Sequence, residues 1–321
     1  MKIINKFLLI IPFFLIVNSC ENFGVINKSF AGNPPVTTIT PAPLFRGLYV
    51  DSLLYIISDT GKQNTLIRWA VRKNFNALYL YNLTPILSTV NNLSKLDSFI
   101  VRSKRAGLIN ISSARASEST SIDVSNTQST QYYNTRCSIN GKITNFNLEN
   151  EYWNYTSSNT IGNVNFSTWI NYKKNMYNFA KTINYTSDAY IGHLKDPGGS
   201  STQTTMADGL VLYNDRILVH DYVDTVKFAT TDGAWSYLQS RLDAIGKSAI
   251  AKKKVAQIVV IFAGYTADGP QYNMRYYFKY HTFQSAYDKV KASFDKSTFT
   301  GKKGINLIGY QIYAYHRVKD L

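Results

Sequence analysis

The stretch Ile143-Thr-Asn-Phe-Asn-Leu-Glu-Asn-Glu-Tyr-Trp153 decides the fold, because its polar residues recur at every second position. Read as a strand with a period of two, it places Asn145, Asn147, Glu149 and Glu151 on one face. In a half-exposed antiparallel sheet such a face would simply meet water. In a parallel sheet covered by helices on both faces, the same residues must line an enclosed polar space. The neighbouring elements decide between these two cases.

Short apolar runs alternate with amphipathic segments on both sides of this stretch. Segments with apolar residues at intervals of three and four, such as the one containing Trp169, Tyr172 and Met176, indicate helices. The expected strands are 47–51, 77–81, 107–111, 143–151, 189–192, 216–222, 257–262 and 305–312. Eight strands alternating with helices over about 270 residues predict an α/β protein with a single (β/α)8 TIM barrel.

An open, doubly wound sheet is the alternative fold, although the chain contains neither G-x-G-x-x-G nor a P-loop. Only residues 314–321 follow the last expected strand, which is too short a segment for a full closing helix. Residues 23–44 are a candidate to cover that gap, and otherwise the gap stays open.

The first 44 residues are expected to lie outside the barrel, which would span residues 45–321. A basic start and the apolar run 7–17 lead into Asn18-Ser19-Cys20, and this arrangement predicts a signal peptide over residues 1–19. The end of that run resembles a bacterial lipobox, which implies a lipid on Cys20 and a place in the cell envelope outside the cytoplasm, with the outer membrane expected. An ordinary signal peptide is the alternative. Residues 20–44, rich in Pro and Thr, predict an extended tether.

Composition limits the classes of partner. With 45% hydrophobic residues among 321, the chain can bury one large core or two modest ones. The net charge of +15 comes from Lys residues scattered at helical spacing without a nucleic-acid-binding signature. We therefore expect solvated helix surfaces and no nucleic acid, and affinity for anionic polymers or membrane surfaces stays open. The two cysteines exclude a disulfide framework, the four histidines lack ligand spacing, and neither metal nor cofactor is expected. The sequence leaves the oligomeric state undetermined.

Acidic, amide and aromatic residues gather at the carboxyl ends of the expected strands, where barrels build their sites. Carboxylates for acid–base chemistry, amides for hydroxyl groups and aromatic rings for stacking are typical of a carbohydrate site. The sequence therefore predicts an oligosaccharide or polysaccharide partner. The expected site residues are Asn147, Glu149, Glu151, Asp51, Tyr81, Tyr152, Trp153, Tyr190, Asp221, Tyr222, Tyr310 and Gln311.

The segment from Phe146 to Glu151 resembles the fourth-strand signature D-x-x-D-x-D-x-E of family 18 glycoside hydrolases, which include chitinases and endo-β-N-acetylglucosaminidases. The resemblance implies that Glu151 is the proton donor and that Glu149 stands where an aspartate orients the acetamido group of the substrate. It also places Asn147 and Thr144 on two further acidic positions. His220-Asp221-Tyr222 is similar to the family's M-x-Y-D region with the acid and the tyrosine exchanged, and either Tyr310 or Tyr313 can supply the aromatic of the eighth strand.

The match departs from the family at three of the four acidic positions, and Glu149 is one methylene longer than the expected aspartate. Two functions therefore stay open, namely substrate-assisted hydrolysis of glycans that contain N-acetylglucosamine and glycan binding without cleavage. A third interpretation makes the two glutamates a buried structural network. For the enzyme, we expect Glu151 to be the general acid and Glu149 its anionic partner, with their mutual repulsion raising the pKa of one carboxyl. Tyr152, Trp153, Tyr222 and Tyr310 are expected to form a sugar-contacting wall.

Overall fold

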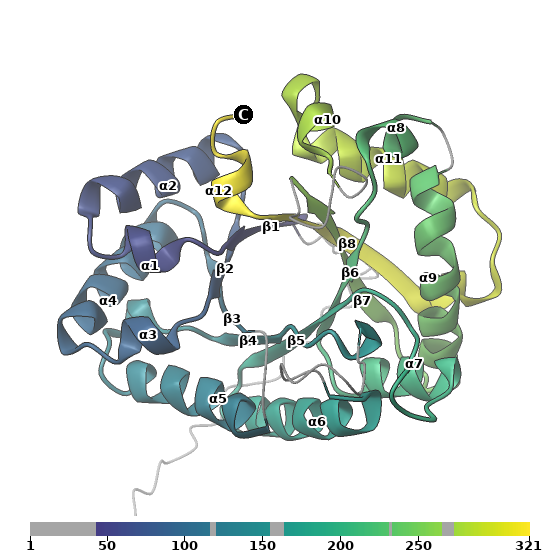
Figure 1. Ribbon diagram of the computed structural model, residues 1–321, viewed down its shortest axis with the longest axis horizontal. Coiled ribbons are helices and arrows are strands. Elements are labelled where there is room, and N and C mark those ends of the chain that lie inside the picture. Colours follow the sequence, from purple (N-terminus) through teal and green to yellow (C-terminus); the bar gives the residue numbers. More distant parts are fainter. Residues whose placement is uncertain (1–42, 116–119, 155–163, 231–232, 265–272) are drawn as a thin grey trace, which may run out of the picture. The chain divides into compact units, whose positions relative to one another are not determined.

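The computed structural model describes residues 43–321 except 116–119, 155–163, 231–232 and 265–272, and these residues form one compact unit. Eight parallel strands close into a barrel in sequence order, with β1 paired to both β2 and β8 (Figure 1). This confirms the (β/α)8 barrel. The strands are β1 Phe45–Val50, β2 Ala77–Tyr81, β3 Asn110–Arg115, β4 Asn145–Leu148, β5 Thr186–Ile191, β6 Arg216–His220, β7 Ala256–Ala263 and β8 Ile305–Tyr313.

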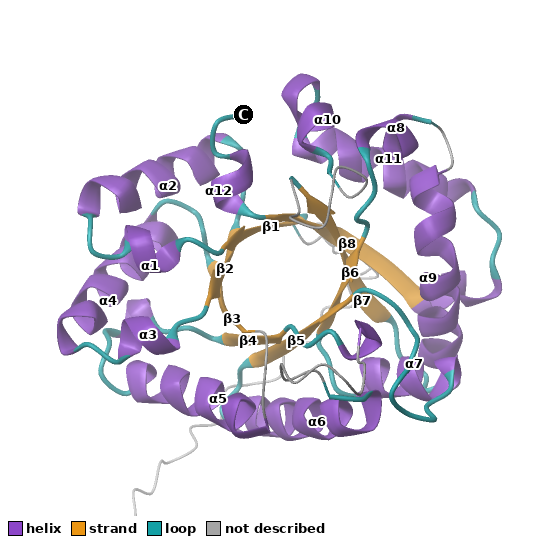
Figure 2. Cartoon of the chain, in the orientation of Figure 1, coloured by secondary structure: helices purple, strands orange, loops and turns teal. Residues whose placement is uncertain are grey.

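Helices surround the barrel and cover the outer faces of its strands (Figure 2). None of those within the described ranges is long and apolar enough to cross a membrane. The helices are α1 Leu53–Ile56, α2 Thr60–Arg72, α3 Thr84–Leu87, α4 Val90–Arg105, α5 Thr120–Asn134, α6 Phe166–Thr182, α7 Gln203–Leu212, α8 Thr225–Ala229, α9 Gly233–Ala251, α10 Arg275–Tyr280, α11 Phe283–Lys296 and α12 Tyr315–Val318, with 3₁₀ turns η1 Ile139–Gly141, η2 Tyr152–Asn154 and η4 Thr300–Gly304.

Four of the major helices end in the same type of turn before the next strand begins. The second residue after the helix has a positive φ at Asn74, Gly107, Asn184 and Lys253, which follow α2, α4, α6 and α9. The next backbone N–H then donates to a carbonyl five residues back, for example from Tyr185 to Ala180 at 2.8 Å. This is the Schellman arrangement, which satisfies carbonyls left over at a helix end and reverses the chain.

Polar side chains fill the lower part of the barrel interior. Asp188 of β5 is fully buried and forms an ion pair with Arg216 of β6 at 2.8 Å. The same carboxylate accepts hydrogen bonds from the Tyr79 hydroxyl at 2.6 Å and from the Asn145 amide at 2.8 Å. Because each of these polar groups has a partner, the layer is rigid and supports the site at the carboxyl ends of the strands.

Only the expected strand 77–81 has the same bounds in the structure, and two of the differences matter for the turns and for the site. Gly107 adopts the left-handed φ of a helix end, so β3 begins at Asn110 and runs to Arg115 instead of covering 107–111. The expected strand 143–151 shortens to β4, and the chain turns after Leu148 so that Glu149 and Glu151 lie in the loop beyond it. The closing segment is the single turn α12, whereas residues 23–42 lie outside the described residues.

Candidate functional site

The loop after β4 places the carboxyl of Glu149 at the carboxyl-terminal mouth of the barrel. The Tyr49 hydroxyl of β1 donates a hydrogen bond to Glu149 Oε2 at 2.5 Å. The side-chain amide of Asn147, two residues earlier on the inward face of β4, donates to Oε1 at 3.0 Å. Both carboxyl oxygens are thus held by groups on rigid strands, which fixes the orientation of this side chain.

Burial controls the charge of this carboxyl. The pKa of Glu149 is raised to about 8, chiefly by burial and also by the negative charge of Glu151. The hydrogen bonds from Tyr49 and Asn147 act in the opposite direction because they favour the ionised form. The net result is a carboxyl that is mostly protonated at neutral pH, as a general acid must be.

Glu151 is partly buried, like Glu149. Its Oε2 accepts a hydrogen bond from the side-chain amide of Asn154 at 2.6 Å. The backbone N–H of Asn154 also donates to the Glu151 carbonyl at 2.8 Å, so the η2 turn holds this glutamate. Both glutamates therefore lie in the loop after β4, and their environments differ in the hydrogen-bond partners of each carboxyl.

Five tyrosines form a continuous series of aromatic contacts that includes Tyr49, the hydrogen-bond partner of Glu149, and we call these five residues the tyrosine ring. The ring centroid of Tyr49 lies 5.7 Å from that of Tyr81 and 5.0 Å from that of Tyr313. The series continues from Tyr313 to Tyr222 at 6.1 Å and from Tyr222 to Tyr190 at 6.4 Å. These residues come from β1, β2, β5, β8 and the end of β6, so the aromatic contacts extend around much of the mouth.

Histidine and arginine side chains support one side of the tyrosine ring. The Tyr190 hydroxyl lies 3.3 Å from His220 Nδ1, and the Tyr237 hydroxyl of α9 lies 3.0 Å from His220 Nε2. Burial lowers the pKa of His220 well below its usual value, so the imidazole is neutral and can accept one hydrogen bond while it donates another. Arg241 of α9 donates to the carbonyls of Gly192 and His220, which ties the ends of β5 and β6 together.

Tyr152 and Trp153 do not line the mouth, contrary to the expected sugar-contacting wall. Tyr152 is fully buried, packs against Phe166 and Trp169, and donates its hydroxyl to the His193 carbonyl at 3.1 Å. Trp153 is buried behind Tyr190, with ring centroids 5.4 Å apart. Both aromatic side chains pack beyond the end of β4 in the layer of helices, where they anchor the loop that carries the two glutamates.

Tyr310 also lies away from the mouth. It is 1% exposed and packs between the barrel and the helices, against Phe75 and Tyr287. Along β8 the inward positions are Gly309, Gln311 and Tyr313, so Tyr313 supplies the aromatic side chain that was assigned to Tyr310. The alternation of side chains along the strand identifies Tyr313, but only when the inward face of β8 is already known.

Three further expected site residues occupy separate places. Asp51 pairs with His316 of α12 beside the mouth, where burial raises the pKa of Asp51. Gln311 is buried inside the barrel next to Gly47. Asp221 follows His220, whose side chain faces the mouth, so the Asp221 side chain points to the opposite side. It is fully buried, and its pKa is raised to about 8. Asp221 therefore belongs to the helix side of β6, near Arg241, and does not contact the space around Glu149.

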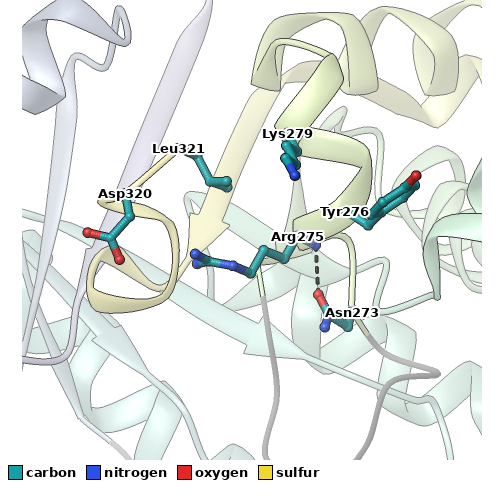
Figure 3. A pocket seen from close by; sticks show the side chains of 6 residues that line it. All are labelled: Asn273, Arg275, Tyr276, Lys279, Asp320 and Leu321. Carbon is teal, nitrogen blue, oxygen red and sulfur yellow. Dashed lines mark hydrogen bonds between the residues drawn. The ribbon is translucent and has the colours of Figure 1, made fainter.

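A separate pocket of about 550 Å³ lies at the rim of the same face, between α10 and α12 (Figure 3). Figure 3 shows the Arg275 side chain extending toward the turn that carries Asp320, while its backbone N–H donates to Asn273 Oδ1 at 2.7 Å. The remaining lining residues are Tyr276, Lys279 and Leu321. Across the described parts of the chain, no group of three or more His, Cys, Asp or Glu side chains is arranged to hold a metal ion.

Comparison with known proteins identifies the fold. No family model matches the sequence, and no curated protein matches it. A family 5 glycoside hydrolase variant from Streptomyces cattleya, in complex with Manβ1-4GlcNAc, superposes with a TM-score of 0.51 at 9% identity over 85% of this chain and 71% of that one. A family 18 chitinase from Cycas revoluta, in complex with allosamidin, gives 0.49 at 10% identity over 86% and 96%. A Rhizomucor miehei β-1,3-glucanosyltransferase variant, in complex with laminaritriose, gives 0.49 at 11% over 83% and 86%. The family 5 structure therefore shares the (β/α)8 barrel fold of this chain.

Proposed function

We propose that this barrel binds and hydrolyses glycans that contain N-acetylglucosamine. The observation that carries the proposal is the Glu149 carboxyl, held by Asn147 and by Tyr49 of the tyrosine ring. A buried carboxyl that stays protonated at neutral pH supplies acid catalysis, and a second carboxyl, Glu151, lies two residues away.

The tyrosine ring supports a sugar ligand more than any other class. Aromatic rings offer apolar faces to the C–H groups of a pyranose, while tyrosine hydroxyls can bond the sugar hydroxyls at the edge. Solved proteins with this fold contain laminaritriose, allosamidin and Manβ1-4GlcNAc, which agrees with a glycan partner. Among the residues that the structure describes, no cation is hydrogen-bonded or ion-paired to the Glu149 carboxyl in a way that would favour a phosphate group.

The proposed chemistry reverses the roles expected for the two glutamates. Glu149, the carboxyl with the raised pKa, gives its proton to the leaving glycosidic oxygen as the bond from that oxygen to the anomeric carbon breaks. The acetamido oxygen of the substrate attacks the same carbon and forms a cyclic intermediate, which water then opens while the Glu149 carboxylate takes a proton from that water. Glu151 is the anionic partner that bonds the acetamido N–H. This is the substrate-assisted alternative to the two-carboxylate scheme.

Glycan binding without turnover is the second candidate function. It is favoured by the amide and hydroxyl residues at Asn147 and Thr144, where the family signature has acids. A site that only binds sugars needs the tyrosine ring and tolerates loss of both carboxyl groups. The two functions therefore differ in the effect of removing the Glu149 carboxyl. An enzyme would lose turnover, whereas a binding protein would keep its affinity for glycans.

The test compares Glu149→Gln with Glu151→Gln on chitin oligosaccharides and N-glycan cores, with turnover and binding measured separately. Loss of a general acid typically costs 10²- to 10⁴-fold in rate, so Glu149→Gln should lose turnover by that factor and keep binding. A loss confined to Glu151→Gln would instead give the donor role to Glu151, as the family resemblance implies. Binding by the wild type without any turnover would establish the binding protein and reject the enzyme.

Attachment to a membrane through Cys20 is a further part of the proposed function, and it rests on the sequence of residues 1–20. A lipid at this position would hold the barrel outside the cytoplasm, next to envelope or extracellular glycans.

A further inference from the structure

The turns that lead from each helix into the next strand share one end of the barrel, which we call the basic face. They comprise residues 73–76, 106–109, 135–144, 183–185, 213–215, 252–255 and 297–304, all within the described residues. The only acidic residue in the turns themselves is Asp215, which pairs with Lys181 at 2.5 Å, and the last turn of α11 adds Asp295, which pairs with Lys291 at 2.6 Å. Exposed cations of these turns and the adjoining helix ends include Arg72, Arg105, Arg136, Lys253, Lys254 and Lys303.

Exposed aliphatic side chains lie among these cations. Ile109 precedes β3 and is 59% exposed, Ile139 begins η1 before β4 and is 74% exposed, and Val255 precedes β7 and is 53% exposed. Cations interleaved with exposed aliphatic residues are typical of a surface that contacts lipid headgroups and the upper acyl region.

The turn after α9 differs from the equivalent turns in carrying two lysines. Three equivalent turns have Asn or Gly at the left-handed position and an apolar residue next, as in Asn74-Phe75 and Gly107-Leu108. The fourth turn has Lys253-Lys254 at these two positions, with a φ of 53° at Lys253. A lysine gains nothing from the left-handed conformation that asparagine or glycine would not gain at lower cost.

Helix dipoles explain only part of this distribution. Cations in the last turn of a helix, such as Arg72 and Arg105, are favoured by the partial negative charge there. That effect falls off within one turn, so it does not account for Lys303 in the segment before β8 or for the exposed Ile139. The opposite face, which holds the mouth, mixes both signs of charge, with Glu149 and Glu151 among its acids.

We propose that the basic face is a docking surface for an anionic lipid bilayer. Its cations meet the headgroup phosphates, and its exposed aliphatic residues enter the boundary with the acyl chains. β1 begins at this end of the barrel, so the tether proposed to end in Cys20 is joined to the barrel on the same side. Docking in this orientation turns the mouth and Glu149 away from the membrane, toward glycans outside it. This inference is independent of the glycan chemistry proposed above.

The experiment places a single exposed tryptophan on either face of the full-length chain. All four native tryptophans are 7% exposed or less, so lipid quenching would report on the added residue. Ile139→Trp marks the basic face, and Tyr55→Trp, at a residue 76% exposed beside the mouth, is the matched control. Each variant is reconstituted with vesicles of brominated phosphatidylglycerol or brominated phosphatidylcholine, and fluorescence quenching is compared.

Strong quenching of the tryptophan at position 139 by the anionic lipid alone, with little at position 55, is the expected result. Arg105→Gln, Lys253→Gln and Lys303→Gln combined in the Ile139→Trp chain should weaken docking about fivefold per cation removed, on the order of 100-fold together. Lys195→Gln, Lys227→Gln and Lys279→Gln on the opposite face should leave the quenching unchanged. Equal quenching at both positions, or no effect of the first triple substitution, would overturn the proposal. Binding to soluble anionic polysaccharide without vesicle quenching would overturn it as well.

Discussion

At the scale of single residues, two buried carboxyls with similar acidity have different consequences. The pKa of Glu149 and that of Asp221 are both raised to about 8, chiefly by burial. Glu149 is bonded by Tyr49 and Asn147 and opens toward the mouth, whereas Asp221 is fully buried on the helix side of β6. A raised pKa therefore identifies a catalytic candidate only where the carboxyl can also reach a ligand.

These two groups predict that the protein loses stability as pH rises above neutral. Between the unfolded values of 4.5 and 3.8 and the folded value of about 8, the folded state binds more protons, so the free energy of unfolding decreases with pH. Below the pKa values of the unfolded state, the two carboxyls contribute their full stabilisation to the folded protein. This stabilisation is lost as pH passes about 8. His193 and His220 have lowered pKa values, and their effect is already constant above pH 6.5.

Urea unfolding at pH 7, 8 and 9 measures this slope. The free energy of unfolding should decrease across the series, and Glu149→Gln should decrease less because one titrating group is gone. A wild type with a constant free energy of unfolding over this range would contradict the raised pKa values.

Tyr49→Phe should raise the pKa of Glu149 further while leaving the aromatic ring in place. The hydroxyl donates to the ionised carboxylate at 2.5 Å and so favours the charged form, which its removal disfavours. The loss of this hydrogen bond should also cost about 0.5–1.5 kcal/mol of stability. Carboxyl NMR titration of Glu149 measures the shift. Tyr313→Phe, whose ring lies 5.0 Å from that of Tyr49, is the control that should move the pKa less.

The sequence identified the two glutamates but missed residues that hold them. Glu149 and Glu151 were recognisable because carboxylates inside an apolar sheet need an enclosed polar space. Tyr49 lies in the apolar run Gly47-Leu-Tyr-Val, where nothing distinguishes a mouth-facing tyrosine from a core one. Tyr310 was assigned in place of Tyr313 because an uncertain strand end leaves the inward face undetermined, and one residue of error exchanges the two faces.

At the scale of elements, the contact between α9 and η4 depends on three glycines. A Cβ at Gly246 would lie 2.0 Å from the Gly301 carbonyl oxygen, and one at Gly304 would lie 2.2 Å from the Gly246 carbonyl oxygen. Backbone meets backbone here, so neither side can move without separating the helix from β8. This explains how η4 lies so close to α9.

Gly246→Ala should therefore destabilise the protein by about 1–3 kcal/mol, the usual cost of overpacking. The clash opposes a gain of about 1 kcal/mol from the better helix propensity of alanine, and the clash is expected to dominate. Gly61→Ala in α2 is the control, since its nearest neighbour is the flexible Asp59 side chain at 3.1 Å, and it should be neutral or slightly stabilising. Thermal or urea unfolding decides, and equal stability of the two variants would refute the backbone contact.

The elements themselves were largely predictable, because eight apolar runs separated by amphipathic segments permit few folds. Strand ends were less predictable where a turn depends on backbone conformation. Gly107 looked like the start of a strand because Leu108 and Ile109 follow it, yet it forms the left-handed end of α4. Glu149 was placed on β4 by its alternation, but the strand ends one residue earlier. Alternation continues through an extended loop, so the pattern alone does not reveal where pairing stops.

At the scale of the whole molecule, the described barrel has two chemically distinct ends. The mouth carries Glu149 and the tyrosine ring, whereas the opposite end carries the basic face. The composition gave a net charge of +15 without saying where that charge lies. Its position follows from the fold, because parallel topology brings all helix-to-strand turns to one end.

The proposed lipid attachment at Cys20 predicts how the whole chain partitions in cells. An anchor with two or more acyl chains holds a protein to a membrane without a basic surface, whereas the basic face without the lipid binds only through contacts that salt screens. Membranes should be washed in about 1 M salt, where the screening length falls to ~3 Å and headgroup contacts of the basic face are lost. Under this wash the wild type should stay with the membranes, and mass spectrometry should find an acylated N-terminal Cys20.

Cys20→Ser should appear in the salt wash, because only the screened contacts of the basic face would remain, or should accumulate with residues 1–19 still attached. Cys137→Ser is the matched control, since Cys137 is the one other cysteine in the sequence and lies half-buried in the turn before η1. It should stay with the membranes like the wild type. A wild-type chain that begins at another residue, or that washes off with salt, would show that Cys20 is not the anchor.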